Sequence, residues 1–156
     1  YGLESDTQET MRHRTEYINN ADIDAVQATV LTPLPGTPLF DRMMEKGQIR
    51  YKDFPHDWQY YDFVEVVYDH RNMSREEFMQ EVKDNWDILY NDNVLKKKFL
   101  RTLKQTRSPL AAIWSYGSNL QYYNMVYEGQ RPRKYIEDIF GLGVTDKELL
   151  KSSPFR

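Results

Sequence analysis

The first quarter of the chain changes from helical spacing of its apolar residues to a short continuous run of them. Apolar side chains recur at helical spacing after Asp6, and Glu9 stands three residues beyond it, as in a capping box. This pattern predicts a helix over about residues 7–20. The run 25–31 is rich in small and β-branched residues, which is typical of a strand covered on both faces. A helix followed by a buried strand indicates an α/β fold.

A proline-rich loop follows the predicted strand. Residues 32–38 contain three prolines, which donate no amide hydrogen bond, and Gly36, which can adopt a turn conformation closed to other residues. In parallel α/β folds, ligands bind at the loops that follow the C-terminal ends of strands. The loop is therefore a candidate wall of a binding pocket, and a stiff connector without a ligand is the alternative. Pro38 then begins a helix that ends at Gly47.

The segment 48–68 is irregular and strongly aromatic, and 64–68 is a further candidate strand. We expect its aromatic side chains to pack over one end of the α/β part. A small site formed by polar residues beside Trp58 is the alternative; its residues would be Asp53, His56 and Asp57.

Beyond residue 70 the pattern is helical. Ser74 and Glu77 have capping-box spacing before a strong apolar stripe, so a helix begins there. Two more helices follow, the second opening at Ser108 and Pro109. The apolar positions of the helix that opens at Ser108 are Leu110, Ile113, Trp114, Leu120 and Tyr127. Short helices are expected at about 135–140 and after a cap formed by Thr145 and Glu148. The predicted fold class is therefore α/β passing into all-α, with a boundary between 1–70 and 71–156.

Composition excludes several kinds of chemistry. The 156 residues include no cysteine, which rules out disulfides, thiolate metal sites and cysteine-held iron–sulfur clusters within the chain. The net charge of -3 does not favour nucleic acid as a partner. No apolar run has the roughly 20 residues that span a bilayer, and we expect a cytoplasmic location. The histidines (His13, His56 and His70) show no metal-ligand spacing and are expected at the surface. The basic residues of 96–107 and of 131–134 are expected to form solvated faces, with anion binding as the alternative.

Two motifs carry a resemblance to a known family. The run GLESDTQET at 2–10, a helix, a strand and then LTPLPGTPLF at 31–40 resemble the fifth and sixth strand–helix turns of radical S-adenosylmethionine (SAM) enzymes, particularly of the branch with a cobalamin-binding domain. The resemblance covers about residues 1–80. The helical remainder is similar to the C-terminal domain found in a subset of that branch.

The resemblance implies a fold and a set of cofactors. The family has a partial TIM-like barrel, and three closely spaced cysteines after its first strand hold a 4Fe-4S cluster that cleaves SAM reductively. Because those cysteines are absent here, and because the chain starts at a strand end without Met, we expect a C-terminal fragment. Its parent would use the cluster, SAM and cobalamin. The fragment would bind none of them alone, its partners would be the upstream domains of the same polypeptide, and the parent's small-molecule substrate is not specified.

The resemblance also assigns site residues. Gly2 matches the second glycine of the family's fifth-strand motif Gly-x-Ile-x-Gly-x-x-Glu, while the acidic position falls on Ser5, with Glu4 one residue early. Gly2 and the loop after the second strand would line the SAM or substrate pocket; the loop residues are Thr32, Pro33, Leu34, Pro35, Gly36 and Thr37. No catalytic or metal-binding residue is predicted. The expected function is therefore the closing part of a cobalamin-dependent radical SAM enzyme, such as a methyltransferase, inactive alone. A stand-alone helical protein-interaction module is the alternative.

Overall fold

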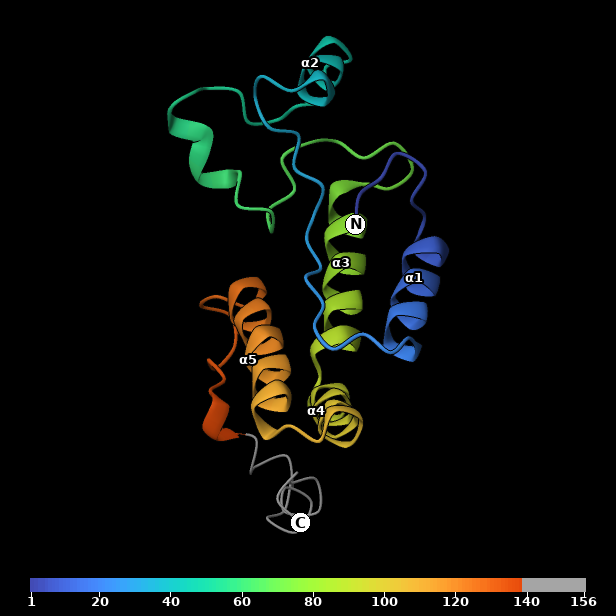
Figure 1. Ribbon diagram of the computed structural model, residues 1–156. Coiled ribbons are helices and arrows are strands. Elements are labelled where there is room, and N and C mark those ends of the chain that lie inside the picture. The colour runs from blue at the N-terminus through green and yellow to red at the C-terminus, as the bar shows by residue number, and fades with distance from the viewer. Residues whose placement is uncertain (139–156) are drawn as a thin grey trace. The chain divides into compact units, whose positions relative to one another are not determined.

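The computed structural model describes residues 1–138, and the chain divides into two units. Unit 1 comprises Tyr1–Arg14 and Ala28–Asn85, and unit 2 comprises Thr15–Gln27 and the residues from Trp86 on. Within 1–138 the structure contains α-helices, the 3-10 helix η1 and a further 3-10 turn at 136–138, but no strand (Figure 1). The helix-dominated character predicted from the sequence is confirmed.

The helices begin and end close to the predicted positions. They are α1 (Gln8–Asn20), α2 (Pro38–Glu45), the 3-10 helix η1 (His56–Tyr60), α3 (Arg75–Tyr90), α4 (Asp92–Thr106) and α5 (Pro109–Val126). The capping box of α3 is confirmed, since the Ser74 amide donates to Glu77 Oε2 at 2.9 Å and the Glu77 amide donates to Ser74 Oγ at 3.2 Å. Ser108 caps α5 by accepting from the Ala111 amide at 3.2 Å. The helix predicted at about 135–140 extends beyond the described residues, and the one capped by Thr145 and Glu148 lies outside them.

The segment 25–31 is extended but is not a strand, contrary to the sequence prediction. In unit 1 its last residues make only scattered backbone bonds. The Tyr1 amine donates to the Thr29 carbonyl at 2.8 Å, the Leu31 amide donates to the Tyr1 carbonyl at 2.7 Å, and the Val30 amide donates to the Phe63 carbonyl at 2.8 Å. A strand needs a continuous ladder of such bonds, and only isolated residues are opposite the segment here.

The other predicted strand, 64–68, is likewise reduced to a single bridge. Tyr68 pairs with Ile49 in antiparallel fashion, flanked by bonds from the Arg50 amide to the Val67 carbonyl and from the Asp69 amide to the Gln48 carbonyl. These bonds place the aromatic segment on the core of unit 1. That core joins α2 to 49–68, and its buried members are Phe40, Met43, Ile49, Tyr61, Val67 and Tyr68.

Unit 1 continues past the predicted domain boundary at residue 70. Phe78, in the first half of α3, is fully buried and stacks on His70 with a ring-centroid distance of 5.0 Å. It also lies 6.4 Å from the Tyr68 ring. Because these side chains form one packed group, the beginning of α3 belongs with the residues before 70 rather than with the helices after it.

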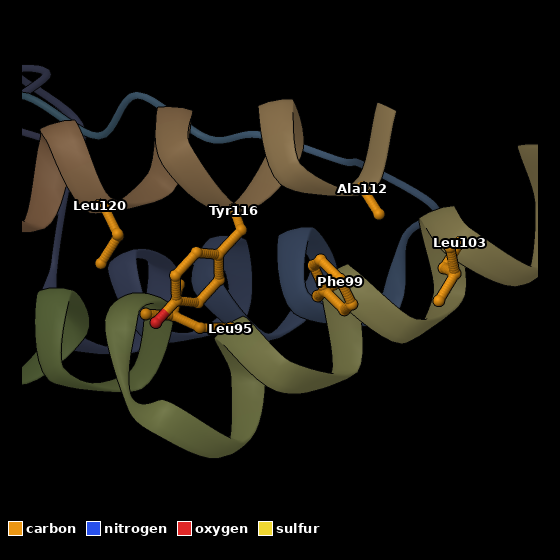
Figure 2. Close-up of a cluster of buried hydrophobic side chains, with 6 residues drawn as sticks. All are labelled: Leu95, Phe99, Leu103, Ala112, Tyr116 and Leu120. Atoms are coloured by element: carbon orange, nitrogen blue, oxygen red, sulfur yellow. The ribbon is translucent and has the colours of Figure 1, made fainter. Parts of the chain in front are cut away.

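The core of unit 2 lies between α4 and α5. Figure 2 shows side chains of both helices pointing into the space between them, and the buried members are Leu95, Phe99, Leu103, Ala112, Tyr116 and Leu120. The Phe99 and Tyr116 rings meet edge to face with centroids 6.3 Å apart, an arrangement that aromatic pairs favour. This contact is part of the packing between the two helices.

Polar side chains of α4 and α5 hold the loop 21–24 of unit 2. Lys98 Nζ donates to the Ile23 carbonyl at 3.0 Å, and Arg101 donates to the Ala21 carbonyl at 3.0 Å. Lys98 is only 3% exposed, and burial, with Arg101 nearby, lowers its pKa to about 8. The prediction that these residues form a solvated basic face is therefore wrong for Lys98 and Arg101, whose donors satisfy backbone carbonyls.

The buried face of α5 also differs from the predicted one. Leu110, Ile113 and Trp114 are exposed. Polar Ser115 and Asn119 are buried instead, because Ser115 Oγ and Asn119 Nδ2 donate to the Asp24 carbonyl at 2.7 and 2.9 Å. Hydrogen bonding to the loop therefore adds two polar positions to the buried face of α5, beside its apolar residues. Within the described residues, no helix is long and apolar enough to cross a membrane.

Tyr116 provides a test of the α4–α5 core. Its hydroxyl is buried, has no hydrogen-bond partner among residues 1–138, and its pKa is raised by burial to about 12. Replacing Tyr116 by Phe removes an unsatisfied polar group and keeps the ring, so we expect unit 2 to stay within about 0.5 kcal/mol of the wild type or to become more stable. Urea unfolding followed by the amide NMR signals of α4 measures this. A loss of more than about 1 kcal/mol would show that the hydroxyl has a partner.

Candidate functional site

The turn that contains Gly2 is organised by one buried carboxylate. Asp6 is 1% exposed, and its Oδ2 accepts from the Gly2 amide at 2.9 Å and from the Leu3 amide at 3.1 Å. Arg14 of α1, eight residues further along the chain, donates to both oxygens of the same carboxylate. The predicted role of Asp6 as the cap of α1 is wrong, since Thr7 Oγ1 accepts from the Thr10 amide instead.

The hydrogen bonds of Asp6 determine its protonation. Burial raises its pKa, but the hydrogen bond from Arg14 and those from the Gly2 and Leu3 amides outweigh burial and hold the pKa below its ordinary value. The carboxylate is therefore charged at neutral pH, and the ion pair with Arg14 neutralises it inside unit 1.

The carbonyl groups of the same turn are bound by side chains from 68–72. Tyr68 Oη donates to the Gly2 carbonyl at 2.6 Å, and His70 Nε2 donates to the Leu3 carbonyl at 2.9 Å. Asn72 Nδ2 lies 3.1 Å from the Glu4 carbonyl and 3.0 Å from the Asp6 carbonyl. The Asn72 amide donates to His70 Nδ1 at 3.2 Å, which sets the tautomer with the proton on Nε2. We call residues 2–6 with their partners in 68–72 the clamped turn.

Gly2 is needed in the clamped turn for two reasons. Its φ is +102°, a conformation that other residues rarely adopt. A Cβ placed on it would lie 2.2 Å from Tyr68 Oη and 2.9 Å from Phe78 Cζ, so the space is already filled by protein. The absence of a side chain at Gly2 therefore serves packing within unit 1.

A cavity of about 470 Å³ opens beside the clamped turn, and we call it the Gly2 cavity. It is lined by backbone or side chains of the turn, α2 and the segment 68–71; the lining residues are Gly2, Leu3, Glu4, Leu31, Leu39, Arg42, Met43, Lys46, Gln48, Tyr68, Asp69, His70 and Arg71. All of them belong to unit 1. Four of the apolar or aromatic members, Leu31, Leu39, Met43 and Tyr68, also belong to the core of this unit. The cavity therefore has an apolar floor that is continuous with the core.

Charged residues at the mouth of the Gly2 cavity are mostly paired. The Glu4 carboxylate lies 3.7 Å from Lys46 Nζ and 3.6 Å from an Arg71 guanidinium nitrogen. Asp69 is paired with Arg50. Arg42, in contrast, has no ion pair or hydrogen bond from its side chain within the described residues. The mouth therefore carries one cation that is not neutralised.

The site residues predicted from the sequence are only partly brought together. Gly2 lines the cavity, but residues 32–37 of the proline-rich loop do not. From that part of the chain, Leu31, directly before the loop, lines the cavity. The Thr32 hydroxyl donates to the Val30 carbonyl at 3.1 Å, and Thr37 Oγ1 caps α2 by accepting from the Phe40 amide at 3.3 Å. Gly36 has φ +83°, which confirms the predicted turn conformation, and there is open space around it.

The other candidates from the sequence do not form a site. Asp53 and His56 are exposed, and the Asp57 carboxylate accepts from the Asp53 amide, which makes it part of a local turn. His13 is exposed as expected. Within residues 1–138 there is no group of His, Cys, Asp or Glu side chains suited to hold a metal.

Sequence reasoning missed the side chains that organise the site. His70 is buried, not at the surface as predicted, and Tyr68 and Asp6 are buried with it. Tyr68 and His70 act through contacts 66 and 67 positions away along the chain, which spacing does not reveal. One local signal exists: an Asp four residues after a Gly can bind the amides of a tight turn as well as cap a helix.

The cofactors that the family resemblance implies fit this chain unequally. Thiolate ligands for an iron–sulfur cluster are missing from the sequence, so the chain's own residues do not hold one. The Gly2 cavity can hold part of an organic molecule, because it combines an apolar floor with a charged mouth. Comparison of the chain with protein-family models, with curated proteins and with solved structures finds no match.

Two glycine substitutions separate packing from backbone strain in unit 1. Gly36→Ala puts a Cβ into open space at positive φ, so we expect it to cost about 1 kcal/mol. Gly2→Ala adds collisions with Tyr68 and Phe78 to the same kind of strain, so we expect a loss at least about 2 kcal/mol larger. Urea unfolding monitored at the amides of Val66 and Val67 measures both. Equal losses would contradict the crowding at Gly2.

The Asp6 carboxylate predicts an acid-sensitive unit 1. Its pKa is lower in the folded chain than in the unfolded one, so its contribution to stability is complete above the ordinary Asp pKa of about 4 and is lost as the pH falls through the folded value. Hydrogen exchange of unit 1 amides between about pH 7 and pH 2 measures the loss, after correction for the intrinsic pH dependence. We expect Asp6→Asn to weaken unit 1 at pH 7 and to flatten the acid dependence, whereas Glu45→Gln, an exposed control at the last residue of α2, leaves the acid dependence unchanged. An acid profile that Asp6→Asn does not flatten would assign the effect to another group.

Proposed function

We propose that this chain is the C-terminal part of a cobalamin-dependent radical SAM enzyme and that its Gly2 cavity forms part of the wall of the parent's SAM or substrate pocket. The chain contributes no cluster ligand and no acid–base group. In this proposal the 4Fe-4S cluster, SAM and cobalamin are held by upstream residues of the parent. The parent's reaction would be methylation or another tailoring step on a small molecule.

The observation that carries the proposal is the backbone pairing of Tyr1 with 29–31. One residue that donates to Thr29 and accepts from Leu31 has the hydrogen-bond pattern of two parallel strands. The two paired segments are joined through α1, as in a strand–helix–strand unit of an α/β barrel. This pairing supports the barrel expected from the two motifs at 2–10 and 31–40.

The position of the Gly2 cavity agrees with such a unit. Parallel strands end at the same edge of a sheet, and enzymes with TIM-like barrels bind their ligands at that edge. The cavity is lined by Gly2 and Leu3, directly after Tyr1, and by Leu31, the last residue with which Tyr1 pairs. Residues at or just beyond the ends of both paired segments thus meet at one hollow, as the proposal requires.

The two buried titratable side chains beside the cavity, Tyr68 and His70, are engaged in holding the clamped turn. His70 uses both ring nitrogens in hydrogen bonds, and the Tyr68 hydroxyl donates to the Gly2 carbonyl. Burial, with Asp6 nearby, raises the pKa of Tyr68 far above its ordinary value, so the hydroxyl remains protonated. The chain's own contribution is therefore to bind and orient a ligand and to exclude water around it.

The proposal is tested on the parent protein. We expect the reading frame upstream of the Tyr1 codon to encode three closely spaced cysteines, and the full-length parent, reconstituted anaerobically with iron and sulfide, to cleave SAM to deoxyadenosine. The parent with those cysteines replaced by alanine is the control and should not cleave SAM. A reading frame without such cysteines, or a reconstituted parent that leaves SAM intact, would overturn the proposal.

A second candidate function is a helical protein-interaction module, and one observation favours it. Leu110 and Trp114 lie one helix turn apart on α5 and are 76% and 65% exposed. Large apolar side chains at such positions are common in protein–protein interfaces. This candidate is preferred if the reading frame begins near Tyr1 and the chain alone is the gene product.

A further inference from the structure

We infer that the Gly2 cavity binds an amphipathic anion, a small molecule with an apolar body and one carboxylate or phosphate group whose charge pairs with Arg42. This inference rests on the proposed function, because it names the chemical class that the pocket of the parent would accept. It can be tested on the chain itself, since every lining residue belongs to unit 1.

The floor of the cavity selects an apolar body. Leu31, Leu39 and Met43 offer only hydrocarbon or thioether surface, and they continue into the core of unit 1. A cavity of about 470 Å³ is in the range of small-ligand pockets. Burying an apolar group on such a surface contributes about 25 cal/mol per Å² of area removed from water.

The polar groups of the clamped turn are already paired within the protein, and the neutral polar side chain of the lining outside the turn is Gln48, whose Nε2 donates to the Asp69 carbonyl at 3.3 Å. The Gly2 and Leu3 amides donate to Asp6, and the Gly2 and Leu3 carbonyls accept from Tyr68 and His70. The imidazole of His70 has both nitrogens engaged. A polar ligand placed deep in the cavity would lose its hydrogen bonds to water without replacing them, which disfavours sugars and other uniformly polar molecules.

The mouth of the cavity selects a negative charge. Its lining residues include three cations, and two of these, Lys46 and Arg71, share the single carboxylate of Glu4. The other carboxylate, Asp69, is held by Arg50. Arg42 is left with no side-chain partner within residues 1–138, and a guanidinium binds a carboxylate or a phosphate through two parallel hydrogen bonds.

The arrangement of floor and mouth fixes how such a ligand lies. Arg42 and Met43 are neighbours on α2, with Arg42 exposed and Met43 buried. A ligand whose head meets Arg42 therefore has its body directed over Met43 toward Leu31 and the Gly2 backbone. Neither a charged head without an apolar body nor an apolar body without the head would use both surfaces.

The test is a titration of the 156-residue chain with short amphiphiles, followed by two-dimensional NMR of its amides. The probes are octanoate, octyl phosphate, octan-1-ol and octyltrimethylammonium, each below its micelle concentration and at about pH 7. We expect both anions to shift the amides of Gly2, Leu31 and Met43 in a saturable manner. The alcohol should bind about fivefold more weakly, because one ion pair at an exposed mouth changes affinity by up to about that factor. The cation should bind no better than the alcohol.

Variants assign the charge effect to Arg42. We expect Arg42→Gln to reduce octanoate affinity to that of octan-1-ol, and Arg12→Gln, which removes an exposed arginine of α1 that does not line the cavity, to bind octanoate like the wild type. The ratio of octyl phosphate to octanoate affinity distinguishes a phosphate from a carboxylate head. Equal binding of anion and alcohol, shifts that spread over the chain without saturating, or wild-type binding by Arg42→Gln would each overturn the inference.

The outcomes for the cavity and for the parent are separable. If octanoate binds as expected but the parent's reading frame encodes no cluster cysteines, the cavity is a binding site for an amphipathic anion and the radical SAM proposal fails. If the parent cleaves SAM but the chain shows no preference for anions, the function stands and the inferred ligand class is wrong.

Discussion

The buried carboxylate of Asp6 is the interaction on which the rest of the site depends. Gly2 and Asp6 are the buried residues of the turn, and each of their polar groups left unpaired would cost on the order of 1–3 kcal/mol. Asp6 binds the amides at the start of the turn, and Tyr68, His70 and Asn72 bind its carbonyls. Because Tyr68 and His70 are buried in unit 1, their hydrogen bonds connect this wall of the Gly2 cavity to the core.

Because His70 is hydrogen-bonded within the clamped turn, it is not free to act on a ligand in the cavity. A general base needs a free lone pair within reach of a ligand, and the nitrogens of His70 are both in use. The groups that organise the turn therefore set its shape, and the inferred recognition of a ligand rests on the apolar floor and on Arg42. This division is consistent with a pocket wall whose chemistry comes from another part of a protein.

Local signals in the sequence predicted the helices well and the site poorly. The caps at Ser74 and Ser108 use atoms a few residues apart, so spacing alone predicts them. The side chains that form the clamped turn are separated by more than sixty residues, and a tyrosine or histidine in an aromatic stretch carries no sign of its partner. Gly2 was predicted from family resemblance, but the structure gives it a packing role, since Tyr68 and Phe78 fill the space of its missing side chain.

The extended segment 25–31 shows why a strand pattern did not become a strand. In unit 2 the amide of Val26 donates to Asn119 Oδ1, and the Tyr90 hydroxyl donates to the Val26 carbonyl. Side chains thus satisfy the backbone there, and a neighbouring strand is not needed. In unit 1 the backbone at 29–31 bonds to the backbone of Tyr1 and Phe63 instead. Apolar composition predicted the burial of the segment. Whether its backbone pairs with another backbone or with side chains depends on which groups the fold brings opposite it. Those groups come from distant parts of the chain, so the sequence of the segment itself does not predict them.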